Sequence, residues 1–88
     1  MEVELGVPFT GWPVRCGIDY EFAMEVVSDS LRDDLLEWAR LFNRNVDDSG
    51  WSSDEARSMH ERQGLVLRDR LQAELGDGYR VTLISASF

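Results

Sequence analysis

The chain has 88 residues, 43% of them hydrophobic, which is enough for one small domain with its own core. Seventeen acidic residues against nine arginines give a net charge of −8, which disfavours direct binding to nucleic acid and to anionic membranes. A basic protein partner would suit this charge, and so would a need for solubility alone.

The cysteine content and the N-terminal sequence predict a cytoplasmic protein. Cys16 is the single cysteine, so neither an internal disulfide nor a cysteine-based metal cluster is expected. The residues MEVELGVPF are acidic and lack a long apolar run, so a signal peptide is not expected. No apolar stretch reaches the roughly 18 residues of a membrane span. We therefore predict one domain over residues 1–88, with no cofactor.

Two strands are predicted in the first third of the chain. Apolar residues alternate with polar ones over residues 2–7, which is typical of a half-buried strand. The stretch PFTGWP that follows contains two prolines and a glycine, which indicates a loop. Alternation returns over residues 18–26 and predicts a second strand, although the apolar residues there would also suit a helical turn.

The middle of the chain predicts two amphipathic helices. In residues 30–44 and again in residues 53–75, apolar side chains fall on one stripe about 100° wide. We expect Ser30 to cap the first helix, with Asp33 as its reciprocal partner. In the second helix, Ser52 and Glu55 have the spacing of a capping box, and Gly76 suits the helix end.

A last strand is predicted from residue 79 to about residue 85, where apolar and polar residues alternate again. The predicted order is therefore strand, strand, helix, helix, strand. Two antiparallel amphipathic helices would cover one face of a small two- or three-stranded sheet, which is an α+β fold in two layers.

The turn NVDDSGWSSDEA between the helices resembles a calcium-binding loop in its first six positions. Asn45, Asp47, Ser49 and Gly50 occupy the first, third, fifth and sixth positions of such a loop. The twelfth position, however, holds Ala56 where that loop needs a bidentate glutamate. We therefore expect a helix start here and no metal site.

Candidate catalytic residues are few. His60 is the only histidine, and it lies on the apolar stripe of the second helix, which favours a packed core position over a ligand or a base. HERQG lacks the second histidine of a zinc motif, and no Gly-x-Ser-x-Gly motif is present. Cys16 could be a nucleophile or a small buried residue, and the second role is the commoner one. We predict no catalytic residue.

A partner-binding surface is predicted near the N-terminus. Four glutamates lie on the polar side of the two predicted strands: Glu2, Glu4, Glu21 and Glu25. Residues 1–30 carry six acids and one arginine, so this third holds −5 of the total charge. The glutamates could bind a basic protein, or they could form a solvated strand face relieved by Arg80 across the sheet. Phe9 and Trp12 in the loop could anchor a partner or fold over the core.

Gly64 lies within the second helix, on its apolar stripe. Glycine costs about 1 kcal/mol there relative to alanine, so we expect a bulky ring, from Trp38 or Phe42, to pack over it. Leu65 points to the opposite side, where it could contact the N-terminal segment or stay exposed.

About 60 residues carry a family resemblance. The stretches LRDDLLEW, GWSSDEA and RQGLVLRDRLQAELGDGYRV resemble a family of small uncharacterised proteins of actinobacteria and their phages. These proteins share a Leu-x-x-Trp helix, a Gly-Trp turn and a second helix that ends in Glu-Leu-Gly. The resemblance implies a fold and gives no activity or site residue.

The sequence as a whole favours a non-enzymatic interaction module: an inhibitor, immunity factor, antitoxin or phage accessory protein with a basic protein partner. The predicted binding residues are Glu2, Glu4, Phe9, Trp12, Glu21 and Glu25. Two alternatives stay open. Open sheet edges would suit a homodimer with a structural role, and carboxylates with His60 would be needed for a small enzyme.

Overall fold

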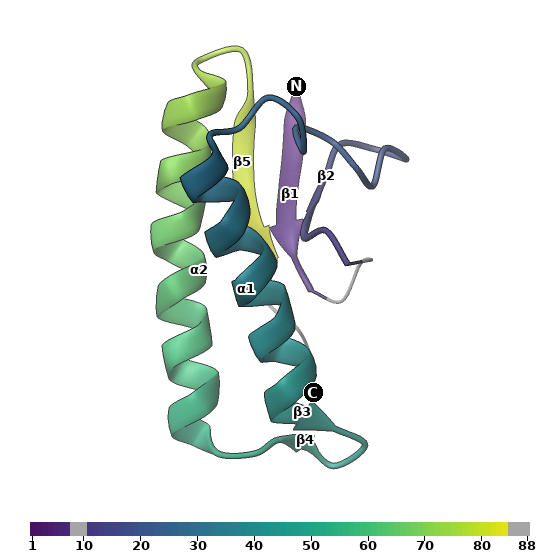
Figure 1. The fold of residues 1–88 in the computed structure, drawn as a ribbon, viewed down its shortest axis with the longest axis vertical. Helices are drawn as coiled ribbons and strands as arrows, with labels where there is room; N and C mark the ends of the chain where they lie inside the picture. The colour runs from purple at the N-terminus through teal and green to yellow at the C-terminus, as the bar shows by residue number, and fades with distance from the viewer. Residues whose placement is uncertain (8–10, 85–88) are drawn as a thin grey trace.

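A computed structural model describes residues 1–7 and 11–84 of the chain. Two helices pack on a small mixed sheet, so the predicted α+β fold is confirmed (Figure 1). The helices are α1 (Asp29–Asn45) and α2 (Asp54–Leu75), and the strands are β1 (Glu2–Gly6), β2 (Val14–Arg15), β3 (Val46–Asp47), β4 (Gly50–Trp51) and β5 (Arg80–Ile84).

The larger sheet has the order β2-β1-β5, with β1 in the middle. β2 runs antiparallel to β1, whereas β5 runs parallel to it, with Val3 opposite Val81 and Leu5 opposite Leu83. The alternation that predicted β1 and β5 places Val3, Leu5 and Val81 in the core. A parallel pair needs a long crossover connection, and the two helices provide it.

The two helices run antiparallel, side by side, and cover one face of the sheet (Figure 1). The predicted stripes are the buried ones. The buried residues are Leu31, Leu35, Trp38, Ala39 and Phe42 in α1, and His60, Gly64, Leu67 and Leu71 in α2. Hydrophobic burial of these stripes against β1 and β5 is the main source of stability in a domain of this size.

Both predicted helix caps are wrong by one or two residues. Ser28 caps α1, since its Oγ accepts a hydrogen bond from the amide of Leu31 at 3.2 Å. Glu74 at the far end of α2 accepts from both the amide and the hydroxyl of Ser28, each at 2.7 Å, and these bonds lower the pKa of Glu74. The cap of α1 is therefore chosen by a contact between the two helices, which favours Ser28 over Ser30.

At the start of α2 the cap is Ser53, whose Oγ accepts from the amide of Ala56 at 3.0 Å. Ser52 instead donates its amide to the carbonyl of Asn45 at 2.7 Å, beside the β3–β4 hairpin. The predicted end of α2 is confirmed, because Gly76 follows the helix with a φ of +83°, a value that favours glycine.

The predicted strand over residues 18–26 is wrong, because this segment consists of turns. Three features define the backbone of this segment. The amides and carbonyls of Cys16 and Asp19 exchange two hydrogen bonds of 3.0 Å, Ala23 has a φ of +67°, and Arg32 Nε donates to the carbonyl of Met24 at 2.7 Å. A carbonyl that is bonded to an arginine side chain is not available to a neighbouring strand, so the alternation in this segment does not extend the sheet.

Candidate functional site

The predicted acidic strand face does not exist as one surface. Glu2 and Glu4 lie on β1 and already have arginine partners on the neighbouring strands. Glu4 Oε1 lies 2.8 Å from Arg15 Nε, and Glu2 Oε1 lies 3.7 Å from Arg80 Nη1. The pairing of Glu2 with Arg80 across the sheet is one of the two alternatives that the sequence left open. The register of β1 and β5 places these two residues opposite each other.

Trp12 packs into the core instead of projecting from its loop. Its side chain is 2% exposed, and Nε1 donates to the carbonyl of Phe22 at 2.8 Å. Of the two predicted roles for this residue, the structure shows the one in which its side chain packs on the core. Phe9 lies outside the described residues.

Glu21 and Glu25 meet at a hollow of about 340 Å³ between the β2–α1 connection and the end of α2. We call it the acidic hollow. Its walls are mostly apolar, and its lining residues are Glu21, Phe22, Ala23, Met24, Glu25, Val26, Leu75 and Tyr79. The rings of Phe22 and Tyr79 lie 5.6 Å apart and join the two elements.

The carboxylates of Glu21 and Glu25 have no hydrogen bond or ion pair within the described chain. Both residues are exposed, as are Asp19 and the neighbouring apolar residues Ile18 and Val26. Exposed apolar side chains that cluster beside polar and charged ones can mark a protein-interaction surface. The structure thus brings together two of the six predicted binding residues, but it places them in a segment of turns and not on the predicted strand.

His60 has a structural environment. Its ring is 5% exposed and stacks on Trp38, with centroids 4.3 Å apart and planes 8° from parallel. His60 Nε2 lies 2.9 Å from the carbonyl oxygen of Trp38, and Trp38 Nε1 donates to the carbonyl of His60 at 2.8 Å. Burial lowers the pKa of His60, so the neutral ring donates through Nε2. This geometry is the packed core position expected from the sequence.

The turn between the helices is a hairpin of β3 and β4, in which Asp47 Oδ1 accepts from the amide of Ser49 at 2.8 Å. Within residues 1–7 and 11–84, no group of three or more His, Cys, Asp or Glu side chains could hold a metal ion. Cys16 is half-buried and carries a free thiol.

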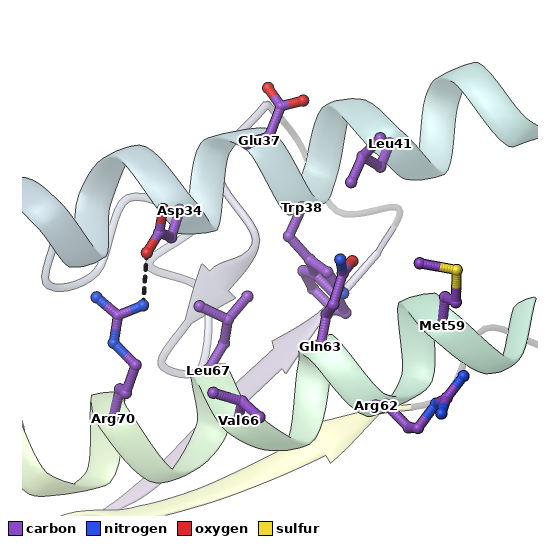
Figure 2. A pocket seen from close by; sticks show the side chains of 10 residues that line it. All are labelled: Asp34, Glu37, Trp38, Leu41, Met59, Arg62, Gln63, Val66, Leu67 and Arg70. Atoms are coloured by element: carbon purple, nitrogen blue, oxygen red, sulfur yellow. Dashed lines mark hydrogen bonds and ion pairs between the residues drawn. The ribbon is translucent and has the colours of Figure 1, made fainter. Parts of the chain in front are cut away.

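A second hollow lies between α1 and α2, on the side away from the sheet, and was not predicted. This helix groove has a volume of about 570 Å³ (Figure 2). Its lining residues are Asp34, Glu37, Trp38 and Leu41 of α1, and Met59, Arg62, Gln63, Val66, Leu67 and Arg70 of α2. Met59 and Val66 lie seven residues apart, so they share one face of α2. That spacing could have revealed an outward apolar stripe beside the buried one.

A family model described as Serratia CdiI immunity protein-like matches residues 3–86. The chain belongs to this family. The match covers both helices and, apart from Glu2 at the start of β1, all strands of the structure, and so includes the acidic hollow and the helix groove. No curated protein matches the chain.

Membership of the CdiI immunity protein-like family agrees with the immunity factor named among the sequence-based predictions. The resemblance to actinobacterial and phage proteins stays a prediction. Within the described residues, no helix is long and apolar enough to cross a membrane.

Proposed function

We propose that this chain is an immunity protein, which binds a protein toxin and blocks it without catalysing a reaction. The observation that carries the proposal is the family match over residues 3–86. The environment of His60 supports it, because a ring stacked on Trp38 and bonded to a backbone carbonyl is poorly placed to exchange protons with a substrate.

The partner that we propose is basic, and the acidic hollow is its main contact. A lysine or arginine side chain of the toxin could place its methylene stem against the apolar walls. Its charged end would then reach Glu21 and Glu25. The Tyr79 ring in the wall offers a further favourable contact for a cation. Such a contact gains strength as the toxin excludes water from the hollow.

The excess of negative charge on the chain also supports a basic partner, because opposite charges accelerate the association of two proteins. Considering only residues 1–7 and 11–84, ten of the 17 acidic residues form no ion pair, against two of the nine arginines, Arg44 and Arg62. This excess creates a negative field that attracts a positively charged toxin over a distance of about 10 Å at moderate salt. Glu2, Glu4, Phe9 and Trp12 stay predicted binding residues. We expect smaller effects from Glu2 and Glu4, because a toxin must compete with Arg80 and Arg15 for them.

The experiment uses the chain as bait in an extract of cells that make it, with mass spectrometry of the bound proteins. A toxin that is retained by the wild-type chain, and from which the chain protects growing cells, is the expected result. Failure to retain any toxin, or retention without protection, would contradict the immunity function.

The contact surface is tested by titration calorimetry with the toxin so identified. Glu21→Gln combined with Glu25→Gln removes two negative charges from the acidic hollow. Asp48→Arg changes the net charge by the same amount at the β3–β4 hairpin, which lies at the other end of α1 (Figure 1). We expect the double variant to bind at least about tenfold more weakly and Asp48→Arg to lose about twofold or less. Equal losses in the two variants would show that only the net charge matters.

A further inference from the structure

The helix groove differs from the rest of the surface in both charge and polarity. Its four charged residues, Asp34, Glu37, Arg62 and Arg70, sum to zero in a chain whose net charge is −8. Its floor is apolar, and Met59 and Val66 on its edge are 47% and 59% exposed. A neutral, apolar groove is a poor match for a basic toxin and a better match for an equally neutral, apolar surface.

We propose that the helix groove is the interface at which two copies of this chain associate. The distribution of charge between its two sides points to this occupant. The side formed by α1 is acidic, with Asp34 and Glu37, whereas the side formed by α2 is basic, with Arg62 and Arg70 (Figure 2). A groove with one acidic side and one basic side is complementary to a second copy of itself.

Symmetry determines how the two copies would meet. When two such faces are related by a two-fold axis parallel to the helices, α1 of each copy lies over α2 of the other. The acidic side of each groove then faces the basic side of its partner, and the apolar floors face each other. An axis perpendicular to the helices would place like charges together. Dimers with two-fold symmetry are the commonest homo-oligomers, and this charge distribution selects one of the two possible axes.

Among the described residues, three of the four charged residues of the groove have an ion-pair partner within the chain, and the fourth does not. Arg70 Nη1 binds Asp34 across the groove, and Glu37 binds Arg40 at 3.3 Å along α1. Arg62 forms no ion pair among the described residues. In the proposed dimer, the guanidinium of Arg62 faces the acidic side of the second copy. Of the two carboxylates on that side, Glu37 lies nearer to the height of Arg62 along the helix axes.

The groove is long enough for helix-to-helix packing. From Met59 to Arg70, α2 extends about 17 Å at 1.5 Å per residue, which is about three helical turns. Two α1–α2 pairs that meet over this length would form four helices in two layers between two outer sheets. Packing of this kind buries Val66, Met59 and Leu41, which are exposed or half-buried in one chain.

The first test compares two exposed apolar residues that are neighbours on α2. Val66 lines the groove, whereas Leu65, 44% exposed, does not. By sedimentation at micromolar concentrations, the wild-type chain and Leu65→Asp should form dimers. Val66→Asp should weaken dimer formation at least about tenfold, because its carboxylate would be buried between the two copies at the apolar edge of the groove. Circular dichroism checks that both variants keep their helices.

The second test exchanges charges between the two sides. Glu37→Arg alone sets two arginines against each other at each contact, and Arg62→Glu alone sets two glutamates against each other, so each variant should be monomeric by itself. In an equal mixture of the two, both contacts join opposite charges again, and dimers should return. Recovery in the mixture requires that the contact lies between chains, which an effect within one chain could not produce.

The proposal is overturned if the wild-type chain stays monomeric at several hundred micromolar, or if Val66→Asp dimerises like Leu65→Asp. It is also overturned if Val66→Asp abolishes toxin binding in a chain that is monomeric, since the groove would then belong to the toxin. The sedimentation outcomes are independent of the immunity function, because sedimentation of the isolated chain requires no toxin.

Discussion

Replacement of Gly64 by alanine should destabilise the protein, although alanine is the better helix former. A Cβ atom on Gly64 would lie 3.0 Å from Trp38 Cζ2, and 3.0 and 3.2 Å from the two terminal methyl carbons of Leu83. Optimal carbon–carbon contacts are about 3.5–4.0 Å, so both neighbours would have to move. The sequence-based expectation that a bulky ring, from Trp38 or Phe42, packs over this glycine is confirmed with Trp38, and β5 contributes Leu83 as a second neighbour.

Two opposing energies decide the outcome. Alanine gains about 1 kcal/mol in helix propensity, and overpacking of a core costs about 1–3 kcal/mol. The half-buried Leu83 side chain can move at small cost. Trp38 cannot, because its ring is held by the hydrogen bond to the carbonyl of His60 and by the stacked His60 ring. We therefore expect a net loss of about 1 kcal/mol for Gly64→Ala, or about 4–8 °C in Tm. For Gly64→Leu we expect about 3 kcal/mol or more.

Thermal and urea denaturation of four proteins would measure this balance: wild type, Gly64→Ala, Leu83→Ala and the double variant. Removal of the Leu83 methyl groups eliminates two of the three close contacts but leaves the contact with Trp38, so Gly64→Ala should cost only slightly less in the Leu83→Ala background, by about 0.5 kcal/mol or less. An increase in Tm for the single variant Gly64→Ala would refute the argument, since it would show that the helix can accept a Cβ at no cost.

The other predictions concern His60 and the cap of α1. Because the pKa of His60 is below its unfolded value of about 6.5, unfolding takes up a proton, and the stability of the protein should fall as pH drops below that value. His60→Gln should be less stable at pH 7.5 and should lose less stability than wild type between pH 7 and 5, as measured by urea denaturation. Ser28→Ala should cost more than Ser53→Ala, for which we expect about 1 kcal/mol, because Ser28 also binds Glu74. Glu74 has a lowered pKa, so the stability that its bonds to Ser28 contribute is present above pH 4.5 and is lost as pH falls further. At low pH, Ser28→Ala and Ser53→Ala should therefore become more alike in Tm.

The helices and the two long strands were predictable because their signals are repeated along the chain. The buried stripe of α1 contains five apolar residues at helical spacing, and that of α2 contains His60, Gly64, Leu67 and Leu71 at the same spacing, so one exception does not change the prediction. The caps failed because serines are close together at both helix starts, and local spacing alone cannot choose among them. The choice between Ser28 and Ser30 depends on Glu74, which is 46 residues away from Ser28.

The acidic hollow could be predicted only in part. The sequence identified Glu21 and Glu25 as binding residues but placed them on a strand, because the alternation around them resembles that of β1. The segment is held out of the sheet by side chains from other elements, including Trp12, which donates to Phe22, and Arg32, which donates to Met24. Contacts of this kind leave no periodic pattern in the sequence. The contribution of Leu75 and Tyr79 to the hollow depends on how α2 ends beside the segment.

The parallel pairing of β1 with β5 has a consequence for how the protein folds. Residues 2–6 are synthesised before both helices, whereas their parallel partner in the sheet is made after both helices. Helical pairs form from local contacts and fold fast, whereas a ladder that closes over nearly the whole chain is slow. During translation β1 therefore waits with an unpaired edge, and a chain that stops before Arg80 cannot complete its sheet. The larger sheet is thus complete only when β5 has left the ribosome.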